Sequence, residues 1–196
     1  MTRTSKRWIG AIAIVIVATG IVMSRARHRL PIEPIGGDFT LTDHNGARFE
    51  LSSLRGKVVL VFFGYTYCPD VCPTTLSKLS SVSRRLGDDR TQVKTLYITV
   101  DPERDTPAML RADLQSFDLD ALGLTGSRAE IDRVAKQYGA TYEIVPTPES
   151  AIRYTVTHST SLYALDKRGR VRIQFPYEAP VDQVVRGIRE ILAQGT

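Results

Sequence analysis

Two apolar segments separated by one amphipathic segment restrict the fold more than any other feature of this sequence. Residues 58–63 form an unbroken apolar run, which is typical of a strand covered on both faces. Pro73 suits the first turn of a helix, and Gly87 ends it. Leucine or valine recurs along one side of that helix, at positions 76, 79, 82 and 86. Residues 93–100 form a second strand, so the order predicts a βαβ unit with a parallel strand pair.

The rest of the chain adds elements around this unit. They are a hairpin (39–42 and 48–51) around Asn45-Gly46, a helix from Thr106-Pro107, a helix from the capping box Ser127–Glu130, a hairpin (161–165 and 171–175) and a helix from Pro180. No internal repeat interrupts the pattern. The order predicts one α/β domain with a thioredoxin-like fold and an N-terminal β-hairpin extension.

The positive charge of the chain lies almost entirely at its N-terminus. The formal net charge is +5, yet six Lys or Arg and no acidic residue precede residue 30. The remaining 20 basic residues face 21 acidic ones, which leaves a net charge of −1. Proteins that bind nucleic acids carry their basic surface on the folded domain, so this composition argues against a nucleic-acid partner.

The basic residues bracket an uncharged apolar stretch, residues 8–24. A helix needs about 17 to 25 such residues to cross a bilayer, so we predict a single transmembrane helix. A cleaved signal peptide and a buried helix of a soluble domain are the alternatives. We therefore expect a membrane anchor with basic flanks (1–29), a Pro/Gly linker (30–37) and a folded domain (38–196). The simplest location is a bacterial inner membrane, crossed once, with the domain in the periplasm.

Both cysteines lie in the loop before the helix of the βαβ unit. Cys68 and Cys72 form a C-x-x-x-C pair, too few thiols for a disulfide scaffold or a four-thiolate zinc site. Because Pro73 disfavours helical dihedrals at the preceding residue, we expect Cys72 at the N-cap and Cys68 in the loop. The helix dipole then favours thiolates. Such a pair can form a disulfide or bind a soft cation such as Cu(I), and a purely structural disulfide is the alternative.

A metal site needs at least one more ligand, and His158 is the best candidate. It lies in a Ser/Thr-rich loop before the second hairpin, and in a thioredoxin-like fold that loop faces the cysteine loop. His28 and His44 are expected to be solvated, in the linker region and in a hairpin turn. Two thiolates and one imidazole make a three-coordinate site suited to Cu(I), whereas a closed zinc site would require a fourth protein ligand.

The chain closely resembles the Sco/SenC family of copper chaperones. The matching segments are 36–39 (Gly-Gly-Asp-Phe), 64–73 (Gly-Tyr-Thr-Tyr-Cys-Pro-Asp-Val-Cys-Pro), 100–107 (Val-Asp-Pro-Glu-Arg-Asp-Thr-Pro), 123–126 (Gly-Leu-Thr-Gly) and His158-Ser159. The resemblance implies a membrane-anchored thioredoxin-like domain that delivers copper to the binuclear Cu(A) centre of cytochrome c oxidase. It also implies one copper ion per chain, held by Cys68, Cys72 and His158.

Two residues depart from the family pattern. Tyr67 stands where a histidine is common, and Thr157 stands where an aspartate usually precedes the ligand histidine. Neither change removes a ligand, but the carboxylate that would orient the imidazole is absent from position 157. Asp101, at the end of a central strand, is a candidate to orient the metal ligands by hydrogen bonding or to act as a weak Cu(II) ligand. Alternatively, it fixes a turn together with Asp105 and Thr106, and we favour a structural role for Asp105 and Arg104.

The sequence thus predicts a membrane-anchored copper chaperone, and not an enzyme, whose two cysteines also form a redox pair. The expected partners are the copper-bearing subunit of the oxidase and a thioredoxin-like reductant that keeps Cys68 and Cys72 reduced. The main alternative is a thiol–disulfide oxidoreductase that reduces the cysteines of the oxidase copper site, which would not need His158. A copper- or redox-responsive signalling protein and a peroxidase are further alternatives.

Overall fold

A mixed seven-stranded sheet forms the centre of the computed structural model, which describes residues 30–194. The strand order is β2-β1-β5-β4-β3-β8-β9. The strands are β1 (Thr40–Asp43), β2 (Arg48–Glu50), β3 (Val58–Gly64), β4 (Val93–Thr99), β5 (Ala121–Thr125), β8 (Leu162–Leu165) and β9 (Val171–Phe175).

The predicted βαβ unit is confirmed at the middle of this sheet. All seven residues of β3 are buried, and β3 pairs in parallel with β4. Helix α2 (Val71–Leu86) connects the two strands. Both predicted hairpins are also present, because β1 pairs antiparallel with β2 and β8 with β9. Since parallel strands of an α/β sheet end at the same edge, the loop after β3 and the turn after β4 are neighbours.

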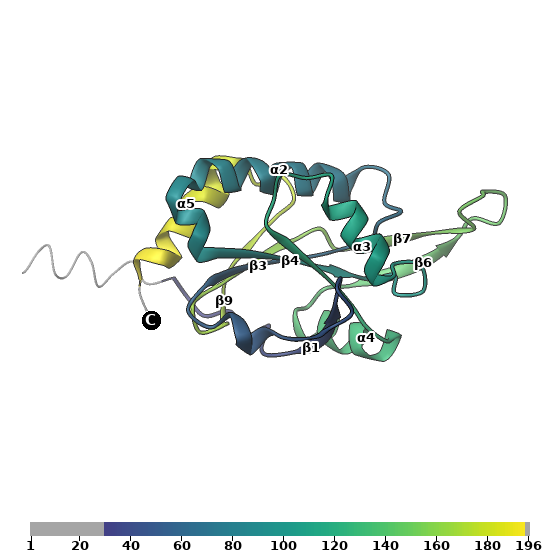
Figure 1. The fold of residues 1–196 in the computed structure, drawn as a ribbon, viewed down its shortest axis with the longest axis horizontal. Coiled ribbons are helices and arrows are strands. Elements are labelled where there is room, and N and C mark those ends of the chain that lie inside the picture. The colour runs from purple at the N-terminus through teal and green to yellow at the C-terminus, as the bar shows by residue number, and fades with distance from the viewer. Residues whose placement is uncertain (1–29, 195–196) are drawn as a thin grey trace, which may run out of the picture. The chain divides into compact units, whose positions relative to one another are not determined.

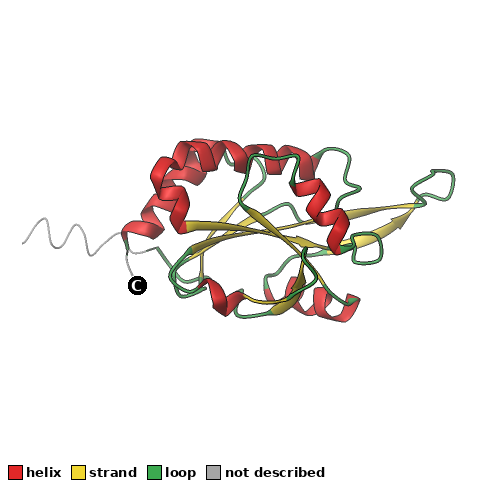
Figure 2. Cartoon of the chain, in the orientation of Figure 1, coloured by secondary structure: helices red, strands yellow, loops and turns green. Residues whose placement is uncertain are grey.

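The helices cover both faces of the sheet. Helices α2 and α5 (Val181–Ala193) lie side by side on one face together with α3 (Pro107–Leu114), whereas α4 (Arg128–Gln137) lies on the other (Figure 1). Figure 2 shows the strands between these two helical layers. Two short 3-10 helices, η1 (Leu51–Leu54) and η2 (Gly87–Gln92), follow β2 and α2. The Thr106 hydroxyl caps α3, and the capping box of Ser127 and Glu130 starts α4, as predicted.

A separate two-stranded sheet was not predicted. Strands β6 (Tyr142–Pro146) and β7 (Tyr154–His158) pair antiparallel and extend outward from the main sheet (Figure 1). The expectation of a loop before the second hairpin is therefore wrong, since His158 is the last residue of a strand. Residues 154–157 alternate aromatic or aliphatic side chains with threonine, which favours a strand. Strand β5 was also missed, because Gly123 weakens its strand signal.

The N-terminal part of the described chain follows the domain surface. The Glu33 amide donates to the Val171 carbonyl, and the Gly36 amide donates to the Gln137 carbonyl. The predicted linker, residues 30–37, thus contacts β9 and the end of α4 through these two residues. Within residues 30–194 no helix is long and apolar enough to cross a membrane. The stretch predicted to do so, residues 8–24, and His28 lie outside the described residues.

Candidate metal centre

The structure brings together the three side chains that the sequence singled out as metal ligands. The sulfurs of Cys68 and Cys72 and a ring nitrogen of His158 all lie within 4.8 Å of one another. Cys72 Sγ is 3.5 Å from His158 Nε2, and both cysteines are free thiols. Because bonds from thiolate or imidazole to a soft metal are about 2.0–2.3 Å long, a small inward shift of these atoms would enclose one ion.

Cys72 is the second residue of α2, so its predicted N-cap position is wrong. The helix begins at Val71, and Asp70 occupies the N-cap without a side-chain capping bond. The N–H groups of a first helical turn have no acceptor within the helix, so Pro73 can follow Cys72 without losing a hydrogen bond. Instead, the Cys72 amide donates to Cys68 Sγ at 3.4 Å. The Cys68 sulfur thus replaces a capping side chain at the positive end of the helix.

The two thiols differ strongly in acidity. A hydrogen bond from the Cys72 thiol lowers the pKa of Cys68 well below the usual thiol value, and an interaction with the His158 side chain lowers it further. The same contact with Cys68, together with burial, raises the pKa of Cys72. Cys72 is 2% exposed, whereas Cys68 is half-buried. In the reduced, metal-free pair, Cys68 is therefore the thiolate and Cys72 keeps the proton, which a metal ion must displace.

The His158 ring is fixed in the orientation that a metal ligand needs. Its Nδ1–H donates to the Ser159 carbonyl at 3.0 Å, so Nε2 faces the sulfurs as an acceptor. Its ring packs edge-on against Phe62 and Tyr65. Thr157 is exposed. A backbone carbonyl thus supplies the contact that a carboxylate at position 157 would otherwise offer.

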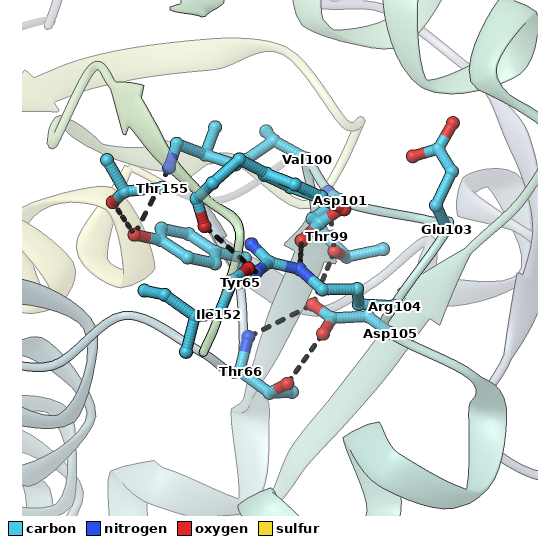
Figure 3. A network of polar contacts seen from close by, with 12 residues as sticks. Tyr65, Thr66, Thr99, Val100, Asp101, Glu103, Arg104, Asp105, Ile152 and Thr155 are labelled. Atoms are coloured by element: carbon cyan, nitrogen blue, oxygen red, sulfur yellow. Dashed lines mark hydrogen bonds and ion pairs between the residues drawn. The ribbon is translucent and has the colours of Figure 1, made fainter. Parts of the chain in front are cut away.

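Asp101 and Arg104 link the turn after β4 to the strand that carries His158 (Figure 3). The buried Asp101 carboxylate accepts from the Tyr154 hydroxyl at 2.8 Å and from Arg104 Nε. Arg104 Nη1 donates to the carbonyls of Ile152 and Tyr154, at 3.1 and 3.0 Å. Asp101 is not part of the group of potential ligand atoms. Its contacts position β7, which carries the histidine.

Asp105 links the same turn to the cysteine loop. Its buried carboxylate accepts from the Thr66 amide at 3.0 Å and from the hydroxyls of Thr66 and Thr99, both at 2.6 Å (Figure 3). Burial raises the pKa of Asp105. Asp105 therefore has the structural role favoured from the sequence, and it also anchors the segment that leads to Cys68.

Three tyrosines surround the Arg104 guanidinium, an arrangement that the sequence analysis missed. The guanidinium carbon lies 3.7 Å from the ring centroid of Tyr154 and 4.7 Å from that of Tyr67, and Tyr65 is further away. The Tyr65 hydroxyl contacts Thr155 Oγ1 at 2.9 Å. Cation–π contacts and hydrogen bonds thus join the residue before Cys68 to the strand of His158. The only sequence signal for Arg104 was its place within the Asp-Pro-Glu-Arg-Asp motif, residues 101–105.

The other histidine of the described domain lies at a different place. The His44 ring is half-buried, and its Nδ1 accepts from the Gly123 amide at 3.3 Å. The expectation of a solvated side chain is therefore wrong. Because β1 pairs with β5, the turn that follows β1 lies beside Gly123 of β5. His44 is not among the residues grouped around the cysteines.

Sequence comparison assigns this geometry to a known family. A family model described as SCO1/SenC matches residues 28–193. The chain belongs to the SCO1/SenC family. The resemblance drawn from the sequence motifs is thereby confirmed. A curated relative, an SCO2-like protein of Rickettsia prowazekii, is 34% identical over 151 residues, which cover 77% of this chain and 74% of that protein.

Two solved structures of SCO1/SenC relatives were determined with copper bound. ScoI of Bradyrhizobium japonicum shares 42% sequence identity with a TM-score of 0.73, over 80% of this chain and 99% of that one. Yeast Sco1 shares 32% identity with a TM-score of 0.76, over 84% and 91% of the two chains. These neighbours confirm the predicted thioredoxin-like α/β domain.

Proposed function

We propose that this chain is a copper chaperone that binds one copper ion through Cys68, Cys72 and His158 and delivers it to the Cu(A) centre of cytochrome c oxidase. The observation that carries the proposal is the convergence of two sulfurs and one imidazole nitrogen within 4.8 Å. Family membership supports it, since two relatives have been solved with copper bound. The target follows from the family resemblance of the motifs around these residues.

The donor set suits transfer as well as binding. Two thiolates and an imidazole favour Cu(I), and Cu(II) could gain an oxygen ligand. Cys72 is 2% exposed at the base of the site, whereas Cys68 is half-buried and its neighbour Tyr67 is exposed. An incoming thiolate of an acceptor protein would therefore reach the ion from the Cys68 side. Copper could then leave by ligand exchange without any chemical turnover, which is why we do not class the protein as an enzyme.

The oxidation state of the two cysteines controls whether the site can bind copper. Cys68 and Cys72 bind copper only as thiolates, and oxidation to a disulfide would remove both ligands. A thioredoxin-like protein that reduces this pair is the partner that such a site would need. We further propose that residues 1–29 anchor the protein in a bacterial inner membrane, that residues 30–37 follow as the linker, and that residues 38–196 lie in the periplasm.

The second candidate function is a thiol–disulfide oxidoreductase. The lowered pKa of Cys68 favours it, because a thiolate is the attacking species in disulfide exchange. The two functions differ in their need for His158, which exchange does not use. His158→Ala therefore separates them, with His44→Ala as a matched control outside the site.

We expect the His158→Ala chain to lose Cu(I) to a competing chelator at concentrations where the unmodified chain and His44→Ala retain it. Its dithiol should still exchange with a small disulfide. Unchanged copper retention in His158→Ala, with exchange intact, would instead favour the oxidoreductase. Metal analysis after separate replacement of Cys68 and Cys72 tests the two sulfur ligands in the same assay.

A further inference from the structure

A buried phenol lies beneath the metal centre and has no assigned role. We propose that the Tyr97 hydroxyl donates a hydrogen bond to the Cys72 sulfur when that sulfur binds copper, so that Tyr97 is a positioning residue of the copper site. This inference rests on the proposed function, because it concerns the copper-bound form of the same centre.

The backbone at Gly64 lets the two groups approach each other. Tyr97 is on β4, directly opposite Phe62 on the neighbouring strand β3. A Cβ atom on Gly64 would lie 2.8 Å from Cys72 Sγ, 3.0 Å from the Tyr97 hydroxyl and 2.7 Å from Tyr97 Cε2. The sulfur and the hydroxyl therefore border the same small space, which any side chain at position 64 would fill. An interaction with the Tyr97 hydroxyl also lowers the pKa of Cys72, against the larger opposing effects of Cys68 and burial.

The surroundings hold the Tyr97 ring in place. Its side chain is fully buried and stacks on Phe62 with ring centroids 5.9 Å apart. Phe62 in turn packs edge-on against His158. Tyr97 thus belongs to an aromatic layer that borders Cys72 and, through Phe62, His158, and its buried hydroxyl cannot turn to water.

Tyr97 Oη has no hydrogen-bond partner of ordinary geometry among the described residues. A buried hydroxyl without a partner destabilises a fold, so its retention needs an explanation. The Cys72 thiol directs its proton to Cys68, and a neutral thiol sulfur is a weak acceptor. When copper replaces that proton, the sulfur gains negative charge and becomes a much stronger acceptor for the Tyr97 O–H.

Tyr163 provides a matched control. Its hydroxyl is also buried and unpaired, and its side chain is 1% exposed. It packs against Phe63 and Tyr138, on the sheet face opposite to Phe62 and Tyr97, because successive residues of β3 point to opposite faces. If unpaired core hydroxyls had no function here, removing either one would have the same effect on copper binding.

The test compares Tyr97→Phe and Tyr163→Phe in the full chain, which each lose one oxygen atom without changing the core volume greatly. Three quantities are measured: the Tm of the metal-free protein, the Cu(I) affinity by chelator competition, and the energy of the thiolate-to-Cu(II) charge-transfer band. For Tyr97→Phe we expect an unchanged or higher metal-free Tm, since an unsatisfied group is removed. We also expect a Cu(I) affinity about tenfold lower and a charge-transfer band at lower energy, since the hydrogen bond stabilises the sulfur electrons. Tyr163→Phe should leave both copper measurements unchanged.

Two results would overturn the inference. One is a Tyr97→Phe chain with the affinity and charge-transfer band of the unmodified protein, and in that case the copper-binding function itself would stand. The other is an equal loss of affinity in both variants, which would assign the effect to the core in general. If the unmodified chain bound no copper at all, the proposed function and this inference would fail together.

Discussion

The two halves of the metal centre are held by different kinds of interaction. The cysteines lie where the fully buried strand β3 meets α2, so the backbone fixes their spacing, and Cys72 N–H binds Cys68 Sγ directly. His158 ends β7, which among residues 30–194 pairs with β6 and not with the main sheet. Side-chain contacts of Arg104 and Asp101 hold that strand in place. Apart from Tyr97 beside Cys72, changes outside the ligands should therefore act mainly on the histidine half of the site, whereas the sulfur half should respond mainly to changes of the cysteines themselves.

The largest effect is expected within the sulfur half, for Cys72→Ala. In the unmodified, reduced and metal-free protein, the hydrogen bond from Cys72 keeps the pKa of Cys68 low, so Cys68 is already a thiolate at neutral pH. Its alkylation by iodoacetamide should be nearly independent of pH between about 6 and 9. Without the Cys72 donor, the pKa of Cys68 rises towards its ordinary value. The alkylation rate should then increase about tenfold per pH unit below that pKa.

Measured alkylation rates of Cys68 across this pH range, located by mass spectrometry, check the prediction. Cys72→Ser is a useful companion, because its hydroxyl can still donate a hydrogen bond to Cys68. It should therefore lie between the unmodified protein and Cys72→Ala. Identical pH profiles for the unmodified protein and Cys72→Ala would show that Cys72 does not acidify Cys68.

An intermediate effect is expected in the histidine half, for Arg104→Met. The substitution removes the hydrogen bonds to the Tyr154 carbonyl of β7 and to the Ile152 carbonyl just before that strand, and it leaves the buried Asp101 without its ion-pair partner. The Cu(I) affinity should fall about tenfold, the usual size for residues behind a metal ligand. Arg111→Met is the matched control, because Arg111 also ties a hairpin turn, by donating to the His44 carbonyl, but makes no contact with β7.

A double-mutant cycle tells whether Arg104 acts through the histidine. In a His158→Ala background, Arg104→Met should cause no further loss of Cu(I) affinity, because the ligand it positions is absent. An additional tenfold loss in that background would mean that Arg104 supports the cysteines or the whole domain. The two halves of the site would then not be held independently.

The smallest effect is expected for Thr157→Asp, which restores the acidic residue usual in the family. Thr157 is exposed, and the Nδ1–H of His158 already donates to the Ser159 carbonyl. A carboxylate there has no remaining ring proton to accept, so the Cu(I) affinity should change less than about threefold. A gain of more than tenfold in the same chelator competition would show that the backbone carbonyl orients the ring poorly.

The same division explains what the sequence could predict. The elements that hold the cysteines have strong local signals, which are the apolar run of β3 and the one-sided leucines of α2. The element that holds His158 has weak ones. The residues of β6 after Tyr142 are exposed, so this strand lacks the alternation of buried and exposed side chains that predicts a strand. Its partner β7 was interpreted as a loop.

The residues that position the ligands were harder still to predict from the sequence. Pro73 argued for an N-cap at Cys72, whereas the N-cap is Asp70, two residues earlier, because a proline in the first turn loses no hydrogen bond. Arg104 binds the backbone of residues at least 48 positions further along the chain, and Tyr97 stacks on a ring of the neighbouring strand. No local sequence pattern encodes contacts of these kinds. The ligand residue types were visible in the sequence, but their supporting contacts required the structure.

X-ray absorption spectroscopy of the Cu(I)-loaded full chain tests the central claim most directly. We predict one copper per chain, bound by two sulfur atoms and one nitrogen atom, with the nitrogen lost in His158→Ala. A spectrum with sulfur ligands only, unchanged in His158→Ala, would contradict it.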